Sequence, residues 1–182
     1  MLNTPVSRYK YQGGTWAADS GCFNAKTYPG DDAWWSWLES QVQHVDTCLF
    51  ATAPDIVGDH EATLERSLPW LSKIRALGYP AAFVGQDGAT VETVPWDEFD
   101  WLFIGGTTEW KLGPVAAEIA AEAKSRGKGV HMGRVNSELR IRYAHHIGCD
   151  TADGTFIGFH PGKNLPAVMA WMRGINDQME LI

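Results

Sequence analysis

Residues 127–155 read GKGVHMGRVNSELRIRYAHHIGCDTADGT and predict a strand, a helix and a second strand in direct succession. The apolar run from Gly129 to Met132 has the length of a strand, and a helix is expected from about Ser137 to Ile147. The second strand is then closed by Asp150-Thr-Ala-Asp-Gly. Strands that alternate with helices in this way are typical of a parallel sheet.

Two carboxylates, Asp150 and Asp153, stand three residues apart at the carboxyl end of that second strand. A three-residue step reverses the direction of a side chain along a regular strand, so only one of the two is expected to point into a cleft. We select Asp153, because backbone at the neighbouring Gly154 can approach a ligand closely. The alternative is that Asp153 only caps the turn before Gly154.

The rest of the chain repeats the alternation of short apolar strands with helices. Further strands are expected at 15–18, 47–53, 81–85 and 101–104, and further helices at 31–45, 59–77, 112–123 and 162–179. Pro69 is expected to kink or divide the second of these helices. The confident strands are too few for a full barrel, so the missing ones are sought in 1–14, 89–94 and 156–159.

This alternation predicts an α/β fold with a parallel sheet, built as a compact or irregular TIM-type (β/α) barrel. Residues 1–14 are predicted to be an N-terminal arm or an edge strand. Residues 15–182 are predicted to form a single barrel domain.

The composition is that of a globular protein of 182 residues, with 45% hydrophobic and 20% charged residues. No apolar run is long enough to span a membrane, and no apolar signal core begins the chain. Three widely separated cysteines favour reduced thiols over a disulfide frame or a zinc site. These features predict a cytoplasmic protein.

The formal net charge of −7 argues against a protein that grips nucleic acid with its whole surface. Residues 124–142 reverse this balance, with six Lys and Arg residues against the single acidic residue Glu138. Two interpretations stay open: a solvated helix face, or a patch that contacts phosphates at Arg134, Arg140 or Arg142. Arg140 and Arg142 stand two residues apart on the expected helix and do not share a face, so at most one of them is expected to contact phosphate.

Residues suited to chemistry or to close ligand contact follow the predicted strands. They are Asp19, Asp55, Gln86, the pair Gly105-Gly106, and Asp153. In parallel α/β folds, and above all in barrels, active sites are built at this carboxyl edge. The sequence therefore predicts that these residues share one site.

Six short motifs resemble, in the same order, those of the tRNA-guanine transglycosylase superfamily. The motifs are DSGCF at 19–23, APDIVGD at 53–59, FVGQDG at 83–88, FIGG at 103–106, HMGRV at 131–135 and GCDTADG at 148–154. The compact chain is similar to the DpdA-like branch, whose members exchange guanine in DNA for a 7-deazaguanine. The resemblance implies a pentosyltransferase that works through a covalent aspartyl–sugar intermediate.

The resemblance also implies a role for individual residues. Asp153 would attack the sugar as nucleophile. Asp19 would act as general acid and base, giving a proton to the leaving base and taking one from the entering base. The implied base-binding residues are Asp55, Gln86, Gly105, Gly106 and Met132. Arg134, Arg140 and Arg142 are the candidates for holding the phosphates that flank a base flipped out of the duplex.

Several of these residues also have a purely structural interpretation, which the sequence leaves open. Asp19 and Asp55 could shape turns or loops, Gln86 could be an exposed turn residue, and Met132 could belong to the core. The glycine pair could form a tight strand-to-loop turn. His131 is expected either to pack beneath the site or to donate a hydrogen bond within it.

The tRNA enzymes of the superfamily carry a C-x-C-x-x-C…H zinc segment after the nucleophile, and nothing resembling it occurs here. The sequence therefore implies no metal and no other cofactor, and it favours DNA over tRNA. The expected small substrate is a 7-deazaguanine base such as preQ0, and a homodimer or a helper protein is left open.

Two alternative functions remain. The first is a tRNA or free-nucleoside transglycosylase that uses the same residues. The second is a non-catalytic barrel that binds nucleic acid or partners an active subunit. Asp19 and Asp153 speak against a binding protein, because binding alone needs neither carboxylate.

Overall fold

The computed structural model describes residues 1–7, 11 and 13–179, and its centre is a parallel sheet. In the described chain the strands pair in sequence order from β1 to β7, and every neighbouring pair is parallel. The strands are β1 (Leu2–Asn3), β2 (Trp16–Ala18), β3 (Cys48–Thr52), β4 (Ala81–Gly85), β5 (Trp101–Ile104), β6 (Gly129–Met132) and β7 (Thr151–Ala152). All their carboxyl ends therefore lie along one edge of the sheet.

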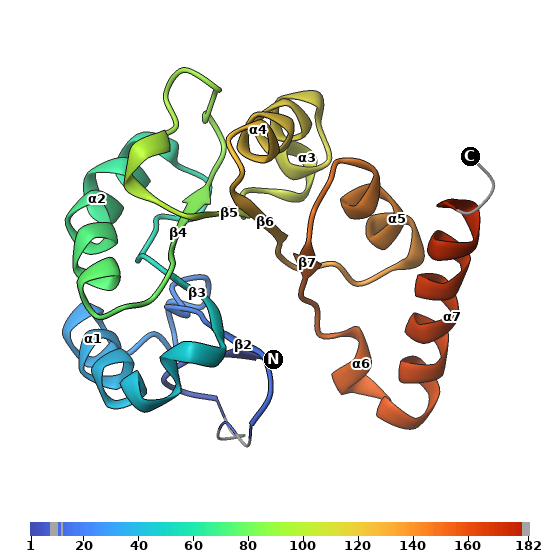
Figure 1. Ribbon diagram of the computed structural model, residues 1–182, viewed down its shortest axis with the longest axis horizontal. Helices are drawn as coiled ribbons and strands as arrows, with labels where there is room; N and C mark the ends of the chain where they lie inside the picture. Colours follow the sequence, from blue (N-terminus) through green and yellow to red (C-terminus); the bar gives the residue numbers. More distant parts are fainter. Residues whose placement is uncertain (8–10, 12, 180–182) are drawn as a thin grey trace.

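Helices connect most of the strands and lie on the outer side of the curled sheet (Figure 1). The α-helices are α1 (Asp31–Ser40), α2 (His60–Ala76), α3 (Thr108–Lys111), α4 (Pro114–Ser125), α5 (Glu138–His146), α6 (Phe156–Phe159) and α7 (Pro161–Met179). Two 3₁₀ helices, η1 (Val42–Thr47) and η2 (Trp96–Glu98), complete the connections. The last helix, α7, packs against α5 and α6 and stands farthest from the strands (Figure 1).

The two faces of the sheet carry different side chains because strand residues alternate in direction. In β5, Leu102 and Ile104 are buried in the large cluster that includes the inner faces of the helices. Trp101 and Phe103 point to the opposite face, where they pack around Phe50 of β3. Side chains thus fill the concave side of the curled sheet, which is a TIM-like half-barrel with β1 and β7 at its edges in the described chain.

The predicted α/β barrel with a parallel sheet is confirmed, and several element bounds agree closely with the sequence patterns. The predicted strands 81–85, 101–104 and 129–132 are β4, β5 and β6. Asp59 caps α2 through a hydrogen bond from Ala62 N, as the Asp before an apolar helical pattern suggests.

Two expectations about the strands are wrong. Residues 89–94 form turns and residues 156–159 form the short helix α6, so neither supplies a strand. Helix α2 runs through the exposed Pro69 as one element, so of the two effects expected of this proline, division of the helix does not occur.

The segment 1–14 contributes β1, whose Leu2 and Asn3 pair with Ala17 and Ala18. Residues 8–10 and 12 of the predicted arm lie outside the described residues. One further finding concerns the membrane: in the part of the chain that the structure describes, no helix combines the length and apolar character needed to cross a bilayer.

Candidate functional site

A pocket of about 210 Å³ opens at the carboxyl edge of the sheet. Each of the seven strands contributes a lining residue, either from the strand itself or from the loop that follows it. The lining comprises Leu2, Asp19, Phe23, Asp55, Val57, Val84, Gln86, Phe103, Gly105, Gly106, Gly133, Arg134, Asp153 and Thr155. The volume is below the roughly 300–1,000 Å³ of sites for drug-sized ligands, so the pocket suits a smaller ligand.

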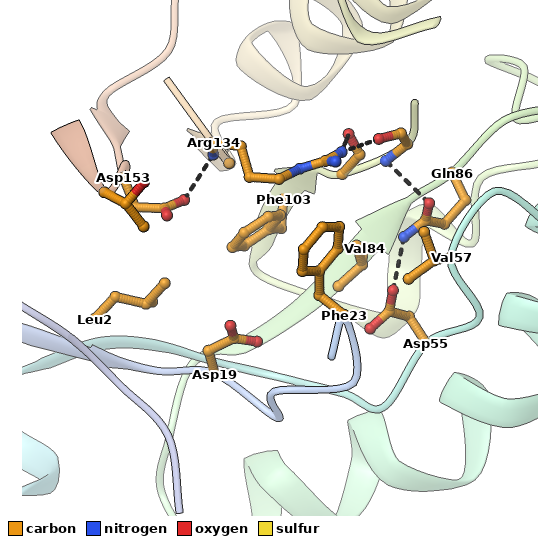
Figure 2. Close-up of a pocket in the computed structure, with 14 residues that line it drawn as sticks. Leu2, Asp19, Phe23, Asp55, Val57, Val84, Gln86, Phe103, Arg134 and Asp153 are labelled. Carbon is orange, nitrogen blue, oxygen red and sulfur yellow. Dashed lines mark hydrogen bonds between the residues drawn. The ribbon is translucent and has the colours of Figure 1, made fainter. Parts of the chain in front are cut away.

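Asp153 lies directly after β7 and lines the pocket, whereas Asp150 does not. Asp153 Oδ1 accepts a hydrogen bond from the Arg134 backbone N–H at 3.2 Å (Figure 2). The same oxygen lies 3.2 Å from His131 Nε2. Asp150 instead forms a 2.7 Å ion pair with Lys124 and accepts a hydrogen bond from Val130 N. Of the two carboxylates, only Asp153 is therefore available to a ligand in this pocket.

His131 is buried behind Asp153, between the rings of Phe50 and Phe103. Its Nδ1 lies 2.8 Å from the hydroxyl of Thr151. Because an imidazole N–H donates and a carboxylate oxygen accepts, we assign His131 Nε2 as the donor to Asp153, with Nδ1 facing the Thr151 hydroxyl. His131 thereby orients the Asp153 carboxylate.

Asp19 follows β2 directly and carries the second pocket carboxylate. Its Oδ1 accepts hydrogen bonds from Gly21 N at 3.3 Å and from the Thr52 hydroxyl at 3.1 Å. Burial raises the pKa of Asp19 above its usual value, and the negative charge of Asp153 adds to this effect. A carboxyl group with a raised pKa keeps its proton to a higher pH than an exposed aspartate does.

Asp55 and Gln86 form a buried pair on the other side of the pocket (Figure 2). Gln86 Nε2 donates to Asp55 Oδ2 at 2.6 Å, and Gln86 Oε1 accepts from the N–H groups of Gly58 and Gly106, both at 2.9 Å. Burial, with the charge of Asp19, raises the pKa of Asp55 to about 7. The Gln86 amide therefore ties three loops together and keeps one N–H free of these bonds.

The loop that carries Asp55 is held by polar residues of α2. Thr63 exchanges hydrogen bonds with the backbone of Ile56, Ser67 donates to Pro54 O, and Arg66 donates to Asp55 O. These contacts explain why Thr63 and Ser67 are fully buried whereas Leu68 is 39% exposed. The buried face of α2 thus includes polar residues as well as Leu71 and Ile74.

Gly105 and Gly106 follow β5 and bring bare backbone to the pocket wall. A Cβ at Gly105 would lie 2.7 Å from Val84 and 2.9 Å from the Gln86 amide nitrogen. Gly106 has a φ of +54°, and a Cβ there would lie 2.3 Å from the Trp110 ring. A side chain at either position would displace the pocket wall.

Arg134 is part of the pocket wall, and its side chain contacts two other pocket loops. Its guanidinium donates to the carbonyls of Gly105 and Gly106 and lies 4.7 Å from the centre of the Phe23 ring. Among the described residues, Arg134 is the only non-glycine residue with a positive φ, which is +60°. Such a conformation in a long side chain costs energy and often marks a functional site.

The other two arginines and Met132 do not line the pocket. Arg140 donates to Arg134 O at 3.3 Å, and Arg142 forms a 2.8 Å ion pair with Glu138 one helical turn away. Met132 is fully buried, and Gly133 occupies the pocket wall beside it. The structure thus brings together Asp19, Asp55, Gln86, Gly105, Gly106, Arg134 and Asp153, and it leaves Met132, Arg140 and Arg142 outside.

Sequence reasoning missed the aromatic lining, Phe23 and Phe103. Phe23 ends the DSGCF motif and is 61% exposed at the pocket, while Phe103 begins FIGG and packs on His131. Both stand in the quoted motifs, so their position next to the polar residues was the available signal. Aromatic faces and bare glycine backbone together offer a flat surface to a planar ring. Among the described residues, no group of three or more His, Cys, Asp and Glu side chains is arranged to hold a metal ion.

Comparisons with known proteins identify the fold. No protein-family model and no curated protein matches the sequence. Among solved structures, the chain is similar to the Bacillus subtilis YkuI protein, with an EAL domain, in complex with substrate c-di-GMP and calcium: 12% identity, TM-score 0.50, covering 92% of this chain and 46% of that one. It is also similar to the PaMucR phosphodiesterase in its c-di-GMP complex, with 13% identity, TM-score 0.49, and coverage of 79% and 60%.

Both of these proteins are much longer than the matched region, so the chain spans only about half of their lengths. At such low identity the likeness to YkuI concerns the arrangement of strands and helices. It identifies the protein as an α/β domain with a curled, TIM-like parallel sheet.

Proposed function

We propose that this protein is a base-exchange transglycosylase that replaces guanine in DNA with a 7-deazaguanine. The observation that carries the proposal is the composition of one pocket. It combines a carboxylate oriented by two donors, Asp153, with a second carboxylate that can hold a proton, Asp19. The same pocket offers the Asp55–Gln86 pair and bare glycine backbone to the edge of a planar base.

The first half-reaction breaks the bond between the sugar and guanine. An Asp153 carboxylate oxygen attacks C1′ of the deoxyribose, and the electron pair of the C1′–N9 bond passes to the base. Asp19 donates a proton to the departing guanine, which leaves as a neutral molecule. A covalent ester between Asp153 and C1′ then conserves the glycosidic linkage for the second step.

The second half-reaction runs the same chemistry with a different base. The incoming 7-deazaguanine loses its N9 proton to Asp19, and its N9 attacks C1′. The ester bond breaks, and its electron pair returns to the Asp153 carboxylate. No net oxidation or hydrolysis occurs, so the reaction needs no redox cofactor and no nucleotide.

The pocket also supports recognition of a guanine-like edge. The carboxyl group of Asp55 and the remaining N–H of Gln86 can meet the amino, amide and carbonyl groups of such a ring. At a pKa of about 7, Asp55 can act as an acceptor or as a donor near neutral pH. Phe23 and Phe103 provide the apolar surface against which the ring can stack.

The position of Arg134 favours an incoming base whose substituent at position 7 is neutral, such as the nitrile of preQ0. Its guanidinium already donates to the carbonyls of Gly105 and Gly106, which would otherwise accept from an ammonium group. A cationic aminomethyl substituent would meet this positive charge, whereas a nitrile can accept a hydrogen bond from it.

The test uses purified protein, DNA with labelled guanine, and preQ0. Wild-type protein is expected to release guanine, incorporate preQ0, and form a DNA adduct that survives a denaturing gel. Asp153→Asn should abolish all three. Asp150→Asn is the matched control, because it removes the neighbouring carboxylate that lies outside the pocket, and it should retain exchange.

Other outcomes distinguish the alternative functions. Exchange on tRNA but not on DNA would keep the chemistry and change the substrate. Binding of nucleic acid without release of guanine from either substrate would overturn the proposed activity and favour a non-catalytic barrel. Because the net charge is −7, the assay is repeated with candidate helper proteins before DNA is abandoned as the substrate.

A further inference from the structure

Lys111 is a buried lysine that the proposed chemistry does not use. It ends α3, the short helix that follows the Gly105-Gly106 loop, and its side chain is 1% exposed. A lysine is rarely this buried unless an acidic group pairs with it. None of the ion pairs among the described residues includes Lys111.

The Lys111 ammonium instead donates to the carbonyl oxygen of Gly133 at 2.6 Å. That carbonyl belongs to the same planar peptide as the N–H of Arg134. The Arg134 N–H donates in turn to Asp153 Oδ1 at 3.2 Å. Because the peptide is rigid, holding its oxygen also fixes the direction of its N–H.

This peptide needs an external support. Arg134 has a φ of +60°, which a non-glycine residue adopts only when its surroundings hold it there. A Cβ at Gly133 would lie 2.7 Å from the Phe103 ring and 3.4 Å from Asp153 Oδ1, so the peptide is also closely packed against the site. Lys111 contacts it from the side opposite to the carboxylate.

We propose that Lys111 is a positioning residue for Asp153, which acts by holding and polarising the Gly133–Arg134 peptide. A charged donor on the carbonyl withdraws electrons from the peptide and strengthens the hydrogen bond that its N–H makes. The carboxylate is thereby oriented for attack. The effect on rate rests on the proposed function, whereas the effect on the peptide does not.

The charges around Lys111 agree with a role that depends on its ammonium. Burial, together with the positive charges of Arg134 and Arg140, lowers the pKa of Lys111 to about 8, and the charge of Asp153 acts in the opposite direction. The nucleophile is thus the acidic group whose charge favours the protonated lysine, although the two side chains do not touch.

The test compares Lys111→Met with Lys128→Met. Lys128 is a matched control, because its ammonium also donates to a backbone carbonyl, Phe99 O at 2.7 Å, far from the pocket. Two quantities are measured in each variant: hydrogen exchange of individual backbone amides, and the single-turnover rate of the covalent DNA adduct together with the affinity for free base.

In Lys111→Met, the Arg134 amide should exchange faster relative to the amides of β5. The rate of adduct formation should fall on the order of 10- to 100-fold, while the affinity for free base changes by less than about twofold. Lys128→Met should show neither effect. This split between rate and affinity would not arise if Lys111 only stabilised the fold.

Two results would overturn the positioning role. One is unchanged exchange at Arg134 in Lys111→Met. The other is a uniform rise in exchange at all core amides, which would indicate a general loss of stability. If wild-type protein forms no adduct, the proposed function fails, and exchange at Arg134 still decides whether Lys111 holds this peptide.

Discussion

His131 Nε2 lies 3.2 Å from Oδ1 of Asp153, and the second imidazole nitrogen is held by the Thr151 hydroxyl at 2.8 Å. The Arg134 N–H meets the same oxygen, Oδ1. Among the described residues, Oδ2 of Asp153 therefore has no hydrogen-bond donor. This asymmetry orients the carboxylate and, under the proposed function, assigns the attack on the sugar to Oδ2.

Replacing His131 with Phe should slow adduct formation on the order of 10- to 100-fold. The phenyl ring can keep the packing between Phe50 and Phe103 but cannot donate to Asp153. Single-turnover kinetics measure the rate, and thermal unfolding measures the fold. Thr151→Val removes only the partner of Nδ1 and should cause a smaller loss. Equal rates for wild type and His131→Phe would refute the orienting role.

The raised pKa of Asp55 should make the free energy of unfolding depend on pH. Its folded pKa of about 7 lies above the 3.8 expected in the unfolded chain, so its contribution is fully present below about pH 4 and is lost as the pH rises through 7. Asp55→Asn removes this titration and can still accept a hydrogen bond from Gln86. The free energy of unfolding of Asp55→Asn minus that of wild type should therefore increase as the pH rises from 4 to 8. The expected increase is on the order of 1–4 kcal/mol.

Urea denaturation of both proteins at pH 4, 6 and 8 measures this difference. Asp150→Asn is the control, because Asp150 is paired with Lys124 at the surface. A difference between Asp55→Asn and wild type that stays constant with pH would show that Asp55 does not titrate in this range.

Much of the site could be predicted because parallel strands end at a common edge. Asp19, Gln86, Gly105 and Asp153 each directly follow a strand, and the position of a residue after a strand is visible in the sequence. A strand-end rule gives the location of a residue and says little about its hydrogen bonds. The Gln86 amide, for example, binds Asp55 and two loop N–H groups rather than standing open to a ligand.

In the basic segment 124–142, the number of Lys and Arg residues alone does not show which of them form ion pairs within the protein. Arg142 stands four residues after Glu138 and Arg126 stands four residues after Glu122, and both pairs form ion pairs. That spacing was readable as helix-surface pairing. By contrast, the path from Lys111 to Asp153 crosses residues of three different elements, and nothing in the spacing of the sequence indicates it.

Gln86 should be important for stability as well as for recognition. Gln86→Met leaves the buried Asp55 carboxyl and the N–H groups of Gly58 and Gly106 without their partner. We expect a loss of about 2–4 kcal/mol in the free energy of unfolding, measured with urea. Gln43→Met at an exposed position should change it by less than about 0.5 kcal/mol. If Gln86→Met also lost less than about 0.5 kcal/mol, the predicted role of this hydrogen-bond network would be contradicted.

Arg134 should select the substituent at position 7 of the incoming base. In wild type, exchange with nitrile-bearing preQ0 should be faster than exchange with the aminomethyl analogue, because the guanidinium repels the ammonium. Arg134→Met should reduce the ratio of the preQ0 rate to the aminomethyl rate on the order of tenfold. Arg126→Met is the control, since Arg126 pairs with Glu122 and lies outside the pocket.

A second variant separates the charge of Arg134 from its backbone conformation. Glycine adopts a φ of +60° without cost, so Arg134→Gly should be more stable than Arg134→Met but equally unselective. Competition assays with both bases measure the selectivity, and urea denaturation measures the stability. If the glycine variant kept the wild-type preference for the nitrile, the selectivity would come from the shape of the loop, and the guanidinium would have no part in it.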